Sequence, residues 1–294
     1  MEIKRLRTLW GVEPGKDMSE WDKLFPELVK IGFDGIEIDT ANLQAPDFPK
    51  LRALCDKHGL AITALIFSSW PQYVGPRPKG LTPDDHLKFY REQIKQASVL
   101  KPLKINAHSG SDVFTPEQSV EFYKGTFAID EELGFAGRVT HETHRNRSLF
   151  NPQATGYILS RVPNLRITLD ISHWVVVSER LLDTSEEDIA LIEQMVPHVE
   201  HIHARIGTTQ ASQCPEPMNP AFKEEREFFE RTWLRVLEHR LKSNDTRPLT
   251  FVPEYGPFPY HPINSKQTHG EVANSEATRL YGMFGAFIAS SQKS

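Results

Sequence analysis

Short apolar runs alternate with longer amphipathic segments along almost the whole chain. The apolar runs that we expect to form strands cover residues 6–12, 35–38, 61–67, 104–108, 139–142, 165–170, 199–204 and 249–253. The segments with apolar residues at helical spacing cover 21–31, 48–58, 84–100, 115–133, 151–162, 185–195, 223–241 and 275–289. Strands that alternate with helices in this way favour a parallel sheet whose faces are covered by helices.

Boundary signals support several of these elements. Gly32 and Gly59 follow expected helices at the position where a left-handed residue ends a helix. Thr115 and Pro116 have the residue types preferred at a helix N-cap and first turn. The pattern therefore predicts discrete helices between the strands.

Eight strands, each followed by a helix, predict an α/β protein with a (β/α)₈ TIM-barrel fold. The 294 residues suit such a barrel, and we expect a single domain over residues 1–294. A doubly wound open sheet is the alternative. That fold would favour a glycine-rich first turn for a dinucleotide, and the segment 11–15, Gly-Val-Glu-Pro-Gly, does not match that pattern.

Composition narrows the class of function. The chain has 34 Lys and Arg against 39 Asp and Glu, a formal charge of −5, and no basic stripe, so we expect no nucleic-acid partner. We expect no membrane association, because no apolar run approaches the ~20 residues of a membrane span. The first residues lack the apolar stretch of a signal peptide, and two cysteines make no disulfide framework, so we expect a cytoplasmic protein. The oligomeric state is open, and a homo-oligomer is compatible with the sequence.

The densest group of chemically versatile residues is the segment 140–147, Thr-His-Glu-Thr-His-Arg-Asn-Arg. Side chains alternate between the two faces of a strand, so Glu142 should point away from His141. We expect His141 to face the surrounding helices and His144 to lie at the rim just past the strand. A polar, solvent-facing loop is the alternative reading of this segment taken alone.

Three further apolar runs carry a potential metal ligand at their ends, namely Asp170, His203 and Glu254. In a TIM barrel the active site lies at the carboxyl ends of the strands, where these side chains and Glu142 would meet. Three carboxylates this close would repel one another unless one were protonated or a cation lay between them. We therefore expect one divalent metal ion, and this mixed oxygen and nitrogen ligand set suits Mn, Co, Mg or Zn.

Other residues near the strand ends are candidates for substrate contacts. Glu37 and His108 end the second and fourth strands, and Glu37 could equally form a salt bridge inside the barrel. Trp10 and Trp70 follow strand-like runs and could form the walls of a sugar site. The Pro- and Gly-rich segment 68–83 is long for a connection, so we interpret it as a lid, with a disordered connection as the alternative.

The order Glu142, Asp170-x-x-His173, His203 and Glu254 resembles the xylose-isomerase-like TIM-barrel superfamily. That group includes ketose 3-epimerases, hydroxypyruvate isomerase, inosose dehydratase and the apurinic endonucleases. The segment 140–145 together with 201–205, His-Ile-His-Ala-Arg, is similar to a branch labelled sugar phosphate isomerase/epimerase. The resemblance extends over nearly the whole chain.

The resemblance implies a metal-dependent isomerase or epimerase acting on a small ketose. Glu142, Asp170, His203 and Glu254 would hold the ion, which would stabilise an enediolate. Glu142 and Glu254, on opposite faces of the substrate, would remove and return the proton next to the carbonyl. The implied substrate-binding residues are His173, Arg205, His108, Glu37, Trp10, Trp70 and His144. Arg205 departs from the epimerase pattern, in which the basic residue lies further along the loop.

Two alternatives use similar residues. A dehydratase or lyase of a keto-sugar or keto-cyclitol would use the same metal and base but expel a β-hydroxyl group. A DNA-repair endonuclease would need three metal ions, yet the third strand ends in Phe67-Ser68-Ser69-Trp70 without a histidine, and no Asp-x-His follows His203. A metal-free binding protein would need another use for the converging carboxylates. The sequence specifies neither the sugar nor its phosphorylation state.

Overall fold

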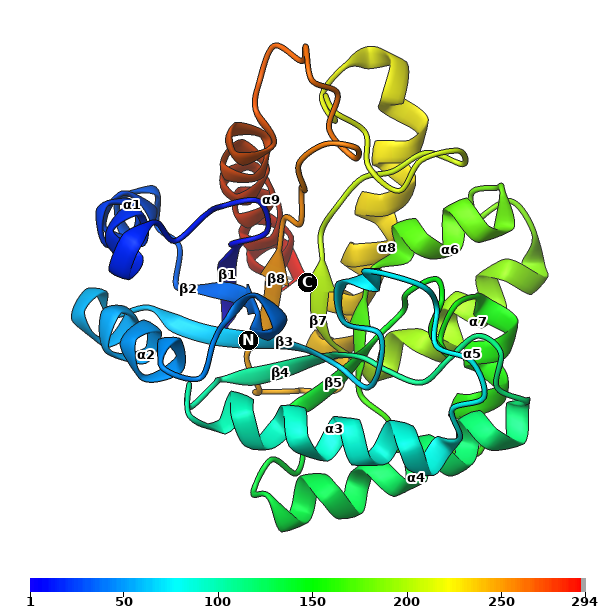
Figure 1. The fold of residues 1–294 in the computed structure, drawn as a ribbon. Helices are drawn as coiled ribbons and strands as arrows, with labels where there is room; N and C mark the ends of the chain where they lie inside the picture. The colour runs from blue at the N-terminus through cyan, green and yellow to red at the C-terminus, as the bar shows by residue number, and fades with distance from the viewer. Residues whose placement is uncertain (292–294) are drawn as a thin grey trace.

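The computed structural model describes residues 1–291 and shows eight parallel strands that close into a barrel in sequential order (Figure 1). The strands are β1 (Ile3–Thr8), β2 (Gly35–Asp39), β3 (Ala61–Phe67), β4 (Lys104–His108), β5 (Val139–Glu142), β6 (Ile167–Leu169), β7 (Val199–His203) and β8 (Leu249–Val252). The barrel closes where β1 pairs in parallel with β8, with Ile3 opposite Leu249. The predicted (β/α)₈ barrel is therefore confirmed.

Helices surround the barrel on its outside (Figure 1). They are α1 (Ser19–Ile31), α2 (Asp47–His58), α3 (Pro83–Ser98), α4 (Pro116–Glu132), α5 (Pro152–Leu159), α6 (Ile171–Ser178), α7 (Glu186–Met195), α8 (Lys223–Lys242) and α9 (His269–Ser291). Within residues 1–291, none of them combines the length and the apolar character needed to cross a membrane.

The strands send apolar side chains outward and polar side chains inward. Ile36 and Ile38 of β2 belong to an apolar core shared with the helices, whereas Glu37 between them reaches His201 of β7. Because β2 and β7 are not neighbours in the sheet, this contact crosses the barrel interior. Thr140 and Thr168 of β5 and β6 also bond to each other, with 2.6 Å between their hydroxyl oxygens. Several polar groups in the barrel interior thus bond to one another, which lowers the cost of burying them.

Four elements differ most from the sequence prediction. The first strand is Ile3–Thr8 and not 6–12, because Leu249 of β8 pairs with Ile3 at the closing seam. The last helix begins at His269 and not at 275, since Thr268 and Glu271 form a reciprocal capping pair at its start. The sixth strand is shorter than predicted and is followed by α6, which was not predicted.

The helix α6 was missed because its sequence, Ile-Ser-His-Trp-Val-Val-Val-Ser, is rich in the β-branched residues typical of strands. Its N-terminus is fixed instead by Asp170, whose Oδ1 accepts a hydrogen bond of 3.0 Å from the backbone N–H of Ser172. Burial of Trp174 and Val175 in the core supplies the rest of the stabilisation. Local propensity is overridden here by capping and packing.

Asp130 on α4 is a buried carboxyl group outside the barrel interior, and its pKa predicts how the stability of the protein depends on pH. Burial raises its pKa to about 7 against the lowering effect of a hydrogen bond from Tyr90, whose hydroxyl lies 2.7 Å from Oδ1. The folded protein therefore retains a proton between pH 4 and 7 that the unfolded chain has lost, so its stability should fall as pH rises through that range. Asp130→Asn, which carries no charge, should be more stable than wild type at pH 8, by at most about 4 kcal/mol.

Urea unfolding of Asp130→Asn and wild type at pH 4 and pH 8 measures this effect, and the gap between them should widen at the higher pH. Glu131→Gln, an exposed neighbour on the same helix, serves as the control and should show no such widening. A constant difference between Asp130→Asn and wild type at the two pH values would contradict the assignment.

Candidate metal centre and active site

Three of the four predicted metal ligands meet at the carboxyl ends of the strands. The ligand atoms of Glu142, Asp170 and His203 lie within 4.8 Å of one another, and all three side chains are buried. Glu254, just after β8, lies alongside them, with its Oε2 3.4 Å from His203 Nδ1. The structure thus brings together the four residues at the ends of β5 to β8.

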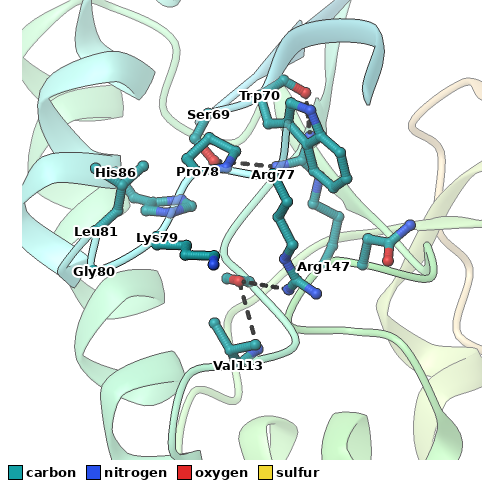
Figure 2. Close-up of a pocket in the computed structure, with 12 residues that line it drawn as sticks. Ser69, Trp70, Arg77, Pro78, Lys79, Gly80, Leu81, His86, Val113 and Arg147 are labelled. Carbon is teal, nitrogen blue, oxygen red and sulfur yellow. Dashed lines mark hydrogen bonds between the residues drawn. The ribbon is translucent and has the colours of Figure 1, made fainter. Parts of the chain in front are cut away.

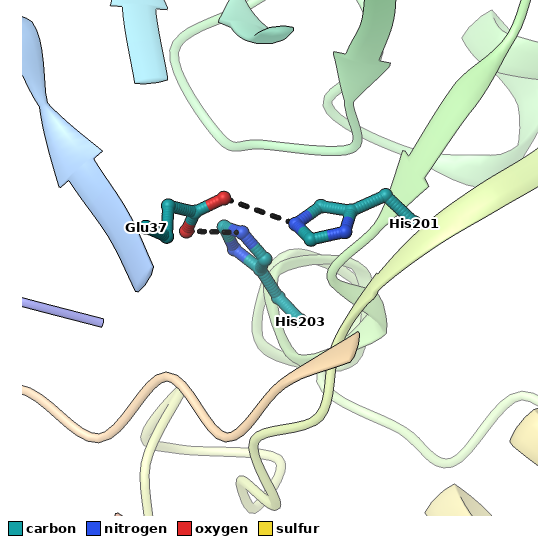
Figure 3. Close-up of side chains that lie close together, drawn as sticks. All are labelled: Glu37, His201 and His203. Atoms are coloured by element: carbon teal, nitrogen blue, oxygen red, sulfur yellow. Dashed lines mark hydrogen bonds and ion pairs between the residues drawn. The ribbon is translucent and has the colours of Figure 1, made fainter. Parts of the chain in front are cut away.

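His203 is held from the far side of its ring by Glu37 (Figure 3). Glu37 Oε1 lies 2.9 Å from His203 Nε2, and its Oε2 lies 3.0 Å from Nε2 of His201. The second nitrogen of His201 is 2.6 Å from the Thr250 hydroxyl, so His201 is a hydrogen-bonded core histidine. A carboxylate behind a histidine in this way fixes the ring orientation of metal-binding histidines.

These contacts set the charge states of both groups. Burial, which raises the pKa of Glu37, is outweighed by the His203 charge and the histidine hydrogen bonds, so the pKa of Glu37 is lowered. Burial alone would lower the pKa of His203, but the surrounding carboxylates, Glu37 first and then Glu254 and Glu142, raise it well above its ordinary value. The surrounding carboxylates therefore favour the protonated, positively charged form of the His203 ring.

Glu142 has one satisfied and one free carboxylate oxygen. Its Oε2 accepts a hydrogen bond of 2.7 Å from the amide of Asn106 and lies 2.7 Å from His108 Nε2, whereas Oε1 is buried without a hydrogen-bond partner. Burial raises the pKa of Glu142, but the charges of His108 and His203 with the two hydrogen bonds lower it to about 2. Glu142 is therefore ionised near neutral pH.

Asp170 is oriented by the start of α6 and by a strongly charged neighbour. Its Oδ1 accepts hydrogen bonds from the backbone and hydroxyl of Ser172, and its backbone bonds to the Thr143 hydroxyl. Its Oδ2 lies 2.5 Å from Nη2 of Arg205. Burial raises the pKa of Asp170 to about 6, opposed by Arg205 and reinforced by Glu254 and Glu142.

Arg205 bridges two of the predicted ligands. Its Nη2 contacts Asp170, and its Nη1 lies 3.3 Å from Glu254 Oε2. Burial lowers the pKa of Arg205, but Asp170 and Glu254 raise it above its ordinary value, so the guanidinium stays charged. The predicted role of Arg205 was substrate binding; the structure places it both against these carboxylates and on the cavity wall.

These residues fit a divalent cation by two criteria. Glu142 Oε1 is buried without a hydrogen-bond partner, and His203 Nδ1 makes only long contacts, 3.4 Å to Glu254 and 3.5 Å to Glu142. Both residues belong to the same group of candidate ligands. The negative charge of this region also exceeds its positive charge, even when His203 is protonated alongside Arg205. The negative charge comes from the carboxylates of Glu37, Glu142, Asp170 and Glu254. Each carboxylate oxygen has two lone pairs, so the contacts of Asp170 with Ser172 and Arg205 leave it able to bind a metal.

A cluster of aromatic side chains lies beside the carboxylates. The hydroxyl of Tyr73 lies 3.0 Å from His108 Nδ1 and 2.9 Å from His144 Nδ1, and the His144 and His173 rings are 3.8 Å apart. Burial first, and nearby cationic groups second, lower the pKa of His144 and of His173 well below the ordinary value. Neutral rings of this kind can bond to sugar hydroxyl groups without adding charge.

A cavity of about 540 Å³ opens above these residues, a volume suited to a small organic molecule. Its wall includes six of the seven predicted substrate-binding residues: Trp10, Glu37, His108, His144, His173 and Arg205. The seventh, Trp70, lies instead in the wall of a neighbouring pocket. We call the larger space the substrate cavity.

Two residues that contribute to this site were not predicted from the sequence. Asn106 holds Glu142, and its shared strand face with His108 was the available signal. Tyr260, in the loop after β8, lines the substrate cavity and packs edge-on against Trp10 with ring centres 5.0 Å apart. No local sequence signal marks Tyr260, because the loop's path is set by tertiary packing.

The family model described as "Xylose isomerase-like TIM barrel" matches residues 25–221, about two thirds of the chain. The chain therefore belongs to this family, which agrees with the resemblance found in the sequence. No curated protein sequence matches the chain.

Several solved structures share the fold at low sequence identity. The probable 3-DHS dehydratase AsbF from Bacillus anthracis has 16% identity and a TM-score of 0.58, with 96% of this chain and 99% of that chain covered. A D-psicose 3-epimerase has 15% identity and a TM-score of 0.57, covering 95% and 98%. An L-ribulose 3-epimerase has 13% identity and a TM-score of 0.61, covering 99% and 97%. At these identities the comparison shows the fold alone.

Proposed function

We propose that this protein is a divalent-metal-dependent isomerase or epimerase of a small ketose. The observation that carries the proposal is the buried cluster of Glu142, Asp170 and His203. Each of the three contacts a residue of the substrate-cavity wall, namely His108, Arg205 and Glu254 in that order. Glu254 completes the proposed ligand set. A bound ion would supply positive charge to neighbouring carbonyl and hydroxyl oxygens of the sugar.

Proton transfer is assigned to Glu142 and Glu254. Glu142 is suited to remove a proton because it is ionised, and its hydrogen bonds to Asn106 and His108 fix its direction. Glu254 lies at the cavity wall and is held by Arg205. One carboxylate removes the proton next to the carbonyl and the other returns one, which gives epimerisation or moves the carbonyl.

The remaining polar groups of the cavity bind and orient the sugar. We assign hydrogen bonds with sugar oxygens to His173, His144 and Arg205, and apolar contact with the ring or chain to Trp10. The segment between β3 and α3, residues 68–82, covers one side through Gln72 and Tyr73. Both residues have positive φ angles, 55° and 58°. Such strained backbone conformations occur mostly at functional sites, which agrees with a lid that closes over a reactive intermediate.

Metal analysis of the purified protein, followed by incubation with a panel of ketoses in heavy water, tests this function. We expect about one divalent ion per chain and the exchange of one carbon-bound proton of the true substrate for deuterium. Absence of a bound divalent ion after metal supplementation, together with no exchange across the panel, would overturn the proposal. Loss of water from the substrate, detected by mass, would instead assign a dehydratase that uses the same base.

A further inference from the structure

A second cavity of about 300 Å³ lies beside the substrate cavity, between the β3–α3 loop, α3 and the loops after β4 and β5 (Figure 2). Its polar and aromatic wall residues include Ser69, Trp70, Arg77, Lys79, His86 and Arg147. We call this cavity the basic pocket, because three of these side chains are cationic. The proposed ketose chemistry uses none of those three.

Arg147 is the most unusual of the three cations. Its side chain is only 1% exposed, so its charge is removed from water. Its hydrogen-bond acceptors are the Tyr73 hydroxyl at 3.1 Å, the Ser69 hydroxyl at 3.4 Å and the backbone carbonyl of Trp70 at 3.2 Å. Within residues 1–291 all of these acceptors are neutral. The guanidinium also lies over the Tyr73 and Phe67 rings, 4.8 and 5.7 Å from their centres, but it pairs with no carboxylate of residues 1–291. A buried charge without a counter-charge is costly, and a bound anion would lower that cost.

Charge balance around the basic pocket favours a dianion. Arg77 forms an ion pair with Asp112 and a hydrogen bond of 3.3 Å to the Ser111 hydroxyl. Lys79 is exposed and forms no ion pair within the described part of the chain. Asp112 therefore compensates one of three cations, which leaves an excess of two positive charges. A phosphoryl group carries close to two negative charges near neutral pH, and arginine binds its oxygens with a matching planar fork.

The basic pocket is connected to the proposed catalytic residues. Asn146 lines both cavities. The Tyr73 hydroxyl that accepts a hydrogen bond from Arg147 also bonds to His108, and His108 contacts Glu142. Only one tyrosine hydroxyl and one histidine ring therefore lie between the Arg147 guanidinium and the Glu142 carboxylate.

We propose that the basic pocket binds a phosphoryl group through Arg147, Arg77 and Lys79. Two sources share this chemistry. One is the phosphate of a phosphorylated ketose, whose reacting carbons lie in the substrate cavity. The other is free inorganic phosphate, which would bind separately and change turnover. The first source rests on the proposed function. The binding site itself does not, because phosphate binding can be measured without turnover.

The first experiment measures binding of inorganic phosphate by calorimetry to wild type, Lys79→Met, Arg147→Met and Lys124→Met. Lys124 is an exposed lysine on α4, outside both cavities, and serves as the matched control. We expect binding at one site, weakened roughly tenfold or more by each of the first two substitutions, since each removes a charge-assisted contact. The control should bind like wild type.

Folding and binding are separated by the choice of variants. Arg147 is buried, so thermal melting of Arg147→Met accompanies its titration, and Arg147→Lys should recover part of the phosphate affinity. Lys79 is exposed, so Lys79→Met reports on binding without a folding defect. Phosphate that does not bind, or that binds Lys79→Met and folded Arg147→Met as tightly as wild type, would overturn the proposal.

A second experiment distinguishes the two sources once a ketose substrate is known. If the phosphate belongs to the substrate, the ratio of kcat/KM for the ketose phosphate to that for the free ketose should fall in Lys79→Met. If free phosphate is the ligand, added phosphate should change turnover of the free ketose, and Lys79→Met should weaken that response. A failure to find any ketose substrate would reject the proposed function but leave the binding result standing.

Discussion

Replacing Glu142 by Gln should lower net turnover by roughly 10²–10⁴-fold, the usual cost of removing an acid–base group. Glutamine keeps the shape and one acceptor oxygen for Asn106 and His108, but it cannot accept the substrate proton. Metal binding should weaken without being lost, because Asp170, His203 and Glu254 remain. In a two-base mechanism, Glu254 should still exchange the proton on its own face of the substrate, so one epimer should take up deuterium without converting.

Glu254→Gln should give the mirror result with the opposite epimer. Nuclear magnetic resonance of each epimer incubated in heavy water separates exchange from conversion. Asp130→Asn replaces a buried carboxyl group outside the site by an amide and should retain wild-type turnover, so it controls for the exchange of a buried carboxyl group for an amide. If neither glutamine variant exchanges a proton while its metal content is intact, a single base or a dehydration would explain the chemistry better.

The fold and the four strand-end residues could be predicted because both depend on short-range patterns. Strands that alternate apolar outward and polar inward residues fix which side chains enter the barrel, and the parallel order of the strands places their ends together. Glu142, Asp170 and His203 therefore meet without any need to know the loops. The pairing of Glu37 with His201 and His203 follows the same alternation, although the sequence left its role open between a salt bridge and a substrate contact.

Features that depend on loop paths and on charge balance could not be predicted. Tyr260 lies in a loop that packs over Trp10, and Trp70, whose backbone has a positive φ of 46°, lies in the wall of the basic pocket. The position of Arg205 between Asp170 and Glu254 depends on where three loops converge. Sequence spacing indicates that such residues are near a site but not which group they contact.

The position of Arg205 leads to a pair of opposite expectations for metal affinity. Asp170→Asn removes a negative charge and a strong ligand, and its metal affinity should fall by on the order of 100-fold or more, since even the groups behind a ligand contribute 10–100-fold. Arg205→Met removes a positive charge that lies 2.5 Å from Asp170 and 3.3 Å from Glu254. At an effective dielectric constant of about 20, a unit charge about 5 Å from a cation opposes it by several kcal/mol.

Arg205→Met should therefore bind the ion at least about tenfold more tightly than wild type, even if its turnover falls. Competition for Mn²⁺ or Zn²⁺ against a coloured chelator measures both affinities without a substrate. Metal should also raise the melting temperature more in Arg205→Met than in wild type, because the metal-free variant leaves Asp170 and Glu254 without their counter-charge. Affinities that change in the same direction in the two variants would place the ion away from Asp170 and Glu254.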